Sequence, residues 1–282
     1  AIDDVLRHAW LNLGLDQFND LALLAVGGYG RAELHPASDV DVLILHDGTE
    51  LPTGAEESVS QFITHLWDLG LDIGSSVRSL ADCVRLATED ITIATNIMES
   101  RTLVGDERLR RDMQRLTGPD RLWPGKAFFI AKRDEQIARH AKHNNTEYNL
   151  EPDLKNAPGG LRDIQTIGWV AKRHFGADTL RDLVSHGFIT EAEFMELDEC
   201  QCVIWRIRFA LFVVSGRSDT RILFDYQRRM AELFGYGDSQ ANHGVERLMQ
   251  DYYRAAMRIS MLNEMLLRYF DEAILGVLVF EH

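Results

Sequence analysis

Short apolar runs alternate with a periodic helical segment through about the first hundred residues. Continuous apolar runs at 21–26 and 40–45 predict two buried strands, and the first of them leads directly into Gly27-Gly28, which predicts a tight turn. Over 56–69 the apolar residues recur every three or four positions, which predicts an amphipathic helix. A third strand is predicted over 71–77. Strands and helices interleaved in this way indicate an α+β core.

After about Gly105 the pattern changes, and helical periodicity dominates. We therefore predict two parts, a core with a mixed sheet and helices over 1–105 and an all-helical domain over 106–282. Residues 144–160 are the exception, because two prolines and a pair of glycines predict an ordered irregular loop, a kind of segment that is often functional. The helices expected in the second part cover 127–141, 161–175, 191–214 and 245–275.

Two aspartates interrupt the second apolar strand. Asp39 and Asp41 are one residue apart, and the two-residue repeat of a strand places both carboxylates on one face. Buried together, two carboxylates raise each other's pKa, so a divalent metal is their natural partner. Asp72 lies in the third predicted strand, where strand pairing would bring it beside the first two. Three carboxylates are sufficient to hold two ions around an in-line phosphoryl displacement.

A candidate phosphate site precedes the aspartates. Gly27 and Gly28 have no side chains to block a phosphate from approaching the backbone N–H groups of the turn. Arg31 follows the turn directly and is the best candidate to offset phosphate charge, whereas Arg101, Lys155 and Arg162 are as readily explained by structural ion pairs. An isolated Asp-x-Asp also caps turns, binds calcium or belongs to sugar-nucleotide transferases. The order of strand, glycine turn, Ser-Asp-x-Asp strand and later acid favours catalysis.

Net charge, cysteine content and hydropathy disfavour some classes of substrate, partner and cellular location. The formal charge of -14 would repel a polyphosphate backbone, which disfavours a nucleic-acid substrate unless a local basic patch overrides the total. Three scattered cysteines, without a zinc-ligand pattern, indicate reduced thiols. We find neither a membrane-spanning run nor a signal peptide, so we expect a cytoplasmic protein with no membrane partner.

Two sequence motifs resemble those of a known family. Residues 26–34 read Val-Gly-Gly-Tyr-Gly-Arg-Ala-Glu-Leu, and residues 36–41 read Pro-x-Ser-Asp-Val-Asp. This resembles the polymerase-β-like nucleotidyltransferase signature in the form found in the bacterial PII uridylyltransferase/uridylyl-removing enzymes, the GlnD family. Segments at 148–165, 205–211 and 270–275 are also similar to that family, so the resemblance covers nearly the whole chain.

The resemblance implies a specific reaction. It is the two-metal transfer of UMP from UTP to a tyrosine of the PII nitrogen-signalling protein, with release of pyrophosphate and with Mg²⁺ or Mn²⁺ as the cofactor. Asp72 would also help to deprotonate the tyrosine hydroxyl. Carried onto this sequence, the nucleotide-binding residues would be Gly27, Gly28, Arg31 and Ser38, and the catalytic and metal-binding residues would be Asp39, Asp41 and Asp72.

Full-length members of that family also have an HD phosphohydrolase domain, which removes UMP, and two ACT domains. His46-Asp47 spells the HD doublet but lacks the other ligands of a metal cage, so we interpret it as the end of a strand. The sequence ends soon after the helical region. We therefore expect a fragment without the HD and ACT domains and without uridylyl-removing activity.

Other hypotheses about the function also fit the sequence. The chain would be a non-catalytic module if it only bound PII or nucleotide. A related adenylyltransferase that acts on glutamine synthetase, or a transferase that acts on a small molecule or RNA, would share the same core. The motif Gly-Gly-Tyr-Gly-Arg-x-Glu-Leu favours the uridylyltransferase family over the adenylyltransferase.

Overall fold

The chain divides into two compact units. The computed structural model describes residues 1–36, 38–236 and 241–276. The first unit is Ala1–Trp123 and the second is Pro124–His282.

A mixed four-stranded sheet forms the centre of the first unit, in the strand order β3-β2-β1-β4. The central strand β1 is antiparallel to β2 and β4, while β2 and β3 are parallel. The three predicted strands are confirmed to within two residues, and β4 was not predicted. The strands are β1 (Leu21–Ala25), β2 (Val40–His46), β3 (Ile73–Ser79) and β4 (Arg101–Gly105).

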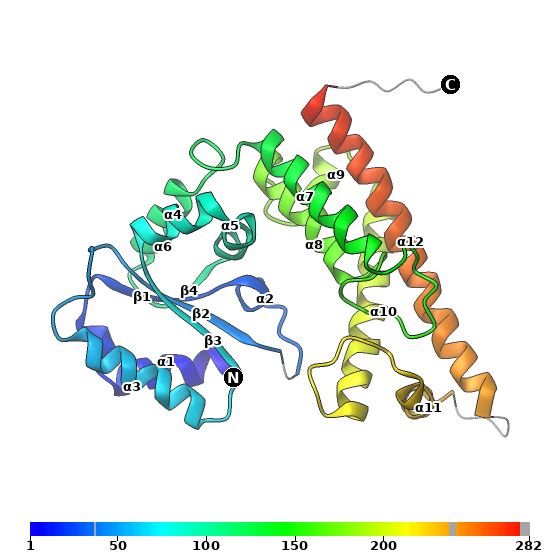
Figure 1. Cartoon of the computed structure of the whole chain (residues 1–282), viewed down its shortest axis with the longest axis horizontal. Coiled ribbons are helices and arrows are strands. Elements are labelled where there is room, and N and C mark those ends of the chain that lie inside the picture. The colour runs from blue at the N-terminus through cyan, green and yellow to red at the C-terminus, as the bar shows by residue number, and fades with distance from the viewer. Residues whose placement is uncertain (37, 237–240, 277–282) are drawn as a thin grey trace. The chain divides into compact units, whose positions relative to one another are not determined.

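Helices cover both faces of this sheet (Figure 1). Every residue of β1 is buried, and Leu23 and Leu24 enter different apolar clusters, so each face of the strand needs its own helical layer. One layer contains α1 (Ile2–Asn12) and α3 (Ala55–Asp68), and the other contains α4 (Leu80–Glu89), α5 (Ile91–Met98) and α6 (Glu107–Leu116). The α+β architecture is therefore confirmed, as is the amphipathic helix expected over 56–69.

The first unit extends further along the chain than predicted, because it includes helix α6. We expected the core to end at residue 105, but the compact unit extends to Trp123. Leu109 and Met113 of α6 are fully buried in the cluster that covers one face of the sheet. Trp123 Nε1 also donates to the carbonyl oxygen of Ala87 at 2.7 Å. The segment after β4 is therefore bound to the sheet layer, because its apolar face is buried there.

The second unit consists of packed helices around a core that includes Ile204, Tyr252 and Ile259. The four helices predicted from periodicity are confirmed, although the last turn of the second one is a π-helix at Ala171–Phe175. Among the described residues, no helix is both long enough and apolar enough to cross a membrane. The helices are α7 (Gly125–Ala141), α8 (Leu161–Val170), α9 (Asp182–Ser185), α10 (Glu191–Ser215), α11 (Phe224–Leu233) and α12 (Ala241–Leu275).

A buried carboxylate fixes the irregular segment that precedes α8. Asp163 is completely buried, and its Oδ1 lies 2.7 Å from Arg139 Nη2 and 2.9 Å from His140 Nε2. The N–H of Gly159 donates to its other oxygen at 2.8 Å. Gly159 has a φ of 74°, and a Cβ there would overlap the backbone of Ala256 in α12. Only glycine therefore allows the loop to approach α12 this closely.

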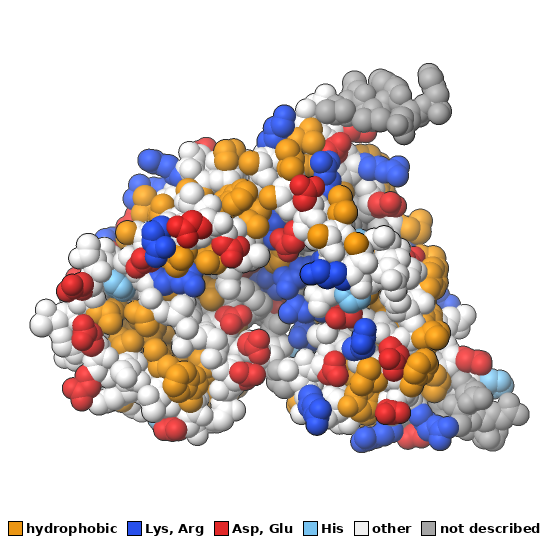
Figure 2. Space-filling model, viewed as in Figure 1, with side chains coloured by type: hydrophobic (Ala, Val, Ile, Leu, Met, Phe, Trp, Pro, Cys, Tyr) orange, Lys and Arg blue, Asp and Glu red, His pale blue; other side chains and the backbone are white. Residues whose placement is uncertain are grey.

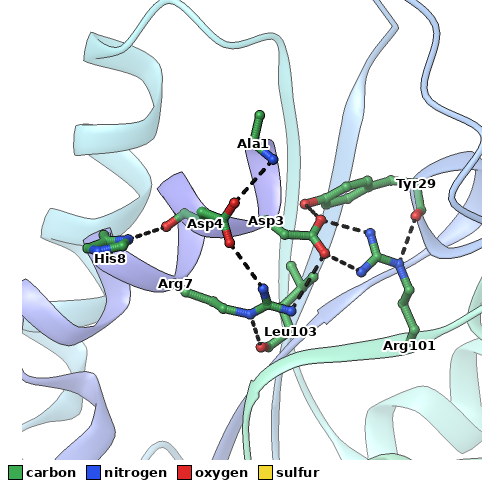
Figure 3. A network of polar contacts seen from close by, with 8 residues as sticks. All are labelled: Ala1, Asp3, Asp4, Arg7, His8, Tyr29, Arg101 and Leu103. Carbon is green, nitrogen blue, oxygen red and sulfur yellow. Dashed lines mark hydrogen bonds and ion pairs between the residues drawn. The ribbon is translucent and has the colours of Figure 1, made fainter.

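An ion-pair network joins α1 to the sheet and to the turn after β1 (Figure 3). Arg101 contacts the Asp3 carboxylate with both terminal nitrogens, at 2.6 and 2.9 Å, and the hydroxyl of Tyr29 donates to the same carboxylate at 2.6 Å. The hydrogen bonds from Arg101 hold the pKa of Asp3 well below its usual range, and the bond from Tyr29 acts in the same direction while burial opposes both. Burial raises the pKa of the Tyr29 hydroxyl, and its bond to Asp3 adds to that shift.

The network predicts a pH-dependent stability difference. Because the pKa of Asp3 is lower in the folded state, its contribution is fully present above the unfolded-state pKa of about 4 and is lost as the pH falls through the folded-state pKa. Asp3→Asn should lower the free energy of unfolding by about 1–3 kcal/mol near neutral pH. The difference from wild type should narrow below about pH 4. Denaturant titrations across this pH range measure it.

Asp4→Asn is the matched control. The side chain of Asp4 is 65% exposed and that of Asp3 is 28% exposed, so the Asp4 change should alter stability much less. Equal losses in the two variants, or a loss from Asp3→Asn that is constant across the pH range, would contradict the assignment.

A second prediction concerns Gly159. Gly159→Ala should destabilise the protein by about 3 kcal/mol, because a left-handed backbone conformation and an overlap with α12 act together. Gly216→Ala should cost only about 1 kcal/mol, since Gly216 also has positive φ but faces open space. Thermal unfolding midpoints compare the two variants directly. If the two midpoints fall by the same amount, the close approach to Ala256 has no energetic role.

Candidate functional site

A short helical turn follows β1 and begins the candidate site. The predicted turn is confirmed as α2 (Gly27–Gly30), and Gly27 has a φ of 56°, a conformation that favours glycine. The N–H of Val26 donates to the carbonyl oxygen of Asp41 at 3.1 Å, which fixes the start of the turn beside β2. A Cβ on Gly30 would overlap the carbonyl oxygen of Glu99, so the turn packs directly against the end of α5.

The Asp41 carboxylate lies between two glycines. Gly74 pairs with Asp41 across the parallel β2–β3 ladder, and a Cβ on Gly74 would overlap Asp41 Oδ1. A Cβ on Gly27 would lie 3.4 Å from Asp41 Oδ2 and 3.2 Å from Asn96 Oδ1. Gly74 therefore provides the room that the half-buried Asp41 carboxylate occupies, and Gly27 lies against the other oxygen of this carboxylate, in the turn.

Asp39 and Asp72 lie just before β2 and β3, respectively, and both are exposed. The N–H of Val40 donates to the carbonyl oxygen of Asp72 at 2.8 Å, and extending the strand register by one residue sets Asp39 opposite Asp72. Within the described ranges, no three or more His, Cys, Asp and Glu side chains are grouped so that they could hold a metal ion. The three aspartates share one end of the strand pair, and their metal-binding role stays a prediction.

The other predicted nucleotide-binding residues are Arg31 and Ser38, of which Arg31 lies beside the turn. The Arg31 guanidinium lies beside it, because a Cβ on Gly28 would be 3.7 Å from Arg31 Nη2. Arg31 Nε also donates to Glu33 Oε2 at 2.8 Å. The N–H of Ser38 donates to the carbonyl oxygen of His35 at 3.0 Å, immediately before the aspartate pair. Contacts of these residues with nucleotide stay predictions.

Two other candidates have structural partners. Arg101 is held by the Asp3 carboxylate, so the structure gives it a role in joining α1 to β4. His46 is buried as the last residue of β2, and Asp47 forms an ion pair with Arg108 at 3.1 Å. The interpretation of His46-Asp47 as the end of a strand is therefore confirmed.

Cationic side chains gather over α7 and α8 in the second unit (Figure 2). Lys132 Nζ and Arg162 Cζ lie 4.5 and 5.3 Å from the centre of the Trp169 ring. Burial lowers the pKa of Lys132, its hydrogen bond to Glu135 at 2.6 Å opposes that shift, and the positive charges of Arg162 and Arg139 add to the lowering. Lys155 is in the preceding loop, where its carbonyl oxygen accepts from the N–H of Arg162 at 2.9 Å. The strongly acidic total charge is thus not evenly distributed.

Sequence reasoning missed Asn96. This side chain is exposed on α5, and its Oδ1 faces the same space beside Gly27 as Asp41 Oδ2. The available signal was a polar amide within the apolar run 91–98, because asparagine is a poor helix former and needs a reason in a helix interior.

Residues 127–267 match the family described as GlnD PII-uridylyltransferase. A bifunctional uridylyltransferase/uridylyl-removing enzyme of Azotobacter vinelandii (strain DJ / ATCC BAA-1303) is 51% identical over 274 residues, which are 97% of this chain and 30% of that protein. The enzymes of the same name from Ectopseudomonas mendocina (strain ymp) and Pseudomonas aeruginosa (strain LESB58) are 50% and 51% identical, over 97% and 98% of this chain.

The chain spans 30% of the length of each of these three relatives. A solved structure described as a toxin-antitoxin with AMP-PNP has a TM-score of 0.26 and 16% identity over 49% of this chain, and so weak a likeness does not support a shared fold. The family match covers half of the chain, and the relatives extend the similarity across both units. The chain belongs to the GlnD PII-uridylyltransferase family.

Proposed function

We propose that this chain performs the uridylyl transfer of its family, moving UMP from UTP to a tyrosine of the PII protein with release of pyrophosphate. The observation that carries the proposal is the Asp41 carboxylate, which lies between Gly27 and Gly74 directly beside the turn after β1. The names of the relatives support uridylyl transfer as the reaction. The first unit would then be a polymerase-β-like nucleotidyltransferase core.

The oxygen ligands of the site fit a divalent cation. Magnesium prefers hard oxygen ligands and is usually bound through one or two carboxylates together with substrate phosphates and water, so it does not require a cage of three acids. Asp39 and Asp41 would hold Mg²⁺ or Mn²⁺, and the position of the Asp41 carboxylate directly beside the glycine turn supports this assignment. The bound ion would stabilise negative charge on the phosphoryl oxygens during transfer.

The remaining residues would bind the substrates and accept a proton. The first N–H groups of α2, at Gly27 and Gly28, have no partner within that helix and would donate to the triphosphate, assisted by Arg31 and Ser38. The tyrosine oxygen would form a bond with the α-phosphorus of UTP as the bond to pyrophosphate breaks. Asp72, exposed at the start of β3, would accept the hydroxyl proton as a carboxylate.

The direct test is label transfer. With α-labelled UTP, Mg²⁺ or Mn²⁺ and purified PII, wild type should label PII, and Asp41→Asn should reduce the rate by at least about 100-fold because it removes a metal-binding charge. Asp47→Asn is the matched control, since Asp47 follows the other end of β2 and pairs with Arg108. Labelling that survives Asp41→Asn would contradict the proposed site.

The same assay separates the alternatives. PII that binds to the chain but stays unlabelled would indicate a binding module. Transfer from ATP to glutamine synthetase, in place of transfer from UTP to PII, would indicate the related adenylyltransferase. Label on RNA would contradict both the proposed acceptor and the expectation drawn from the charge of -14.

Gly74 provides a further prediction. Gly74→Ala should lower kcat by about 10–100-fold while the protein stays folded, because the added methyl group displaces the Asp41 carboxylate from its position. Ser76→Ala, two residues along the same strand and on the same face, should have little effect. Steady-state kinetics with UTP and PII measure both variants. A Gly74→Ala variant with wild-type kcat would show that the exact position of this carboxylate is unimportant.

A further inference from the structure

Two side-chain oxygens converge on one point beside the turn. Asp41 Oδ2 and Asn96 Oδ1 lie 3.4 and 3.2 Å from the position that a Cβ on Gly27 would occupy. Gly27 has no side chain, so both oxygens lie against the same side of its backbone. The two oxygens come from different elements, β2 and α5, and they face the same small space.

Helix α5 holds Asn96 in this position. Its first turn is capped by Asp90, whose Oδ1 accepts from the N–H of Thr92 at 2.7 Å. Its last turn packs against α2, because Gly30 approaches the carbonyl oxygen of Glu99 too closely for any side chain. Asn96 therefore extends from a helix that is fixed at both ends, and its exposed side chain is open to solvent.

Two acceptor oxygens that face one space attract a positive group. A carboxylate carries a negative charge and the amide oxygen a partial negative charge, so a cation between them would be stabilised by both. Carboxylate and amide oxygens are also the hard ligands that Mg²⁺ and Mn²⁺ prefer.

We propose that Asn96 Oδ1 is an additional oxygen ligand, beside Asp41, for the divalent cation of the first unit. This inference rests on the proposed function, since that function requires a cation at Asp41. Asn96 adds a neutral oxygen, so it strengthens cation binding without adding negative charge that would repel the triphosphate of the nucleotide.

Direct binding of Mn²⁺ to the whole chain tests the inference without any turnover. Free Mn²⁺ is followed by electron paramagnetic resonance in the absence of nucleotide. Asn96→Ala should weaken Mn²⁺ binding by about 10-fold, and Asn96→Asp, which keeps an oxygen at the same place, should bind at least as tightly as wild type. Thr92→Ala, one turn earlier on α5 and also exposed, should leave the affinity unchanged.

The metal-free proteins provide a second measurement. Because Asn96 is exposed, Asn96→Ala should have nearly the same thermal unfolding midpoint as wild type without Mn²⁺ and a smaller increase with Mn²⁺. A variant that loses stability without metal, yet binds Mn²⁺ as wild type does, would overturn the proposal and show that Asn96 only supports the turn.

Asp41→Asn separates this inference from the function on which it rests. If Asp41→Asn weakens Mn²⁺ binding and Asn96→Ala does not, only the role of Asn96 is wrong. If neither change alters Mn²⁺ binding, the metal site of the proposed function is also wrong. Weaker binding in both variants, with binding retained in Asn96→Asp, is the expected result.

Discussion

The close approach of the Asp41 carboxylate to two glycines is the constraint on which the candidate site depends. The parallel pairing of β2 with β3 sets Gly74 opposite Asp41, and the end of β1 brings Gly27 to its other oxygen. A Cβ on Gly74 would overlap the carboxylate, whereas a Cβ on Gly27 would only touch it, at 3.4 Å. The carboxylate can therefore keep its position near the start of β2 only because Gly74 lacks a Cβ, and Gly27 lets the turn lie against its other oxygen.

A similar constraint organises the second unit, with a different outcome. We expected an ordered, irregular loop over 144–160, and Gly159 and the following aspartate have clear structural roles. Gly159 approaches Ala256 of α12, and the buried Asp163 carboxylate binds Arg139 and His140 of α7. Since a buried charge is stable only when it is paired, these contacts tie the loop, α7, α8 and α12 together. Glycine and aspartate therefore form the candidate site in the first unit and a buried packing contact in the second.

The local pattern was enough to predict three of the four strands and the longer helices, but few of the long-range contacts. The buried strands β1 and β2 are short apolar runs with a glycine turn after the first, and the long helices have clear periodicity, so each is encoded within one segment. β4 was missed, because Arg101–Gly105 is short and only partly buried. The shorter helices α1, α4, α5, α6, α9 and α11 were not predicted either. The pairing of Asp3 with Arg101 and the position of Asn96 join residues far apart in the chain. No periodicity encodes such contacts, and they follow only from the assembled sheet and helices.

The two glycines at Asp41 differ in what they do, and this difference determines how the site can be dissected. Gly27 has positive φ, begins the turn and borders both Asp41 and Asn96, so any side chain there would disturb the backbone, the proposed phosphate approach and the proposed cation position together. Gly74 lies in an ordinary strand conformation and meets Asp41 alone. Asn96 meets the same space from an exposed helix position. The position of the carboxylate and the number of oxygen ligands are therefore separable properties, and both can be altered without changing the turn that would hold the triphosphate.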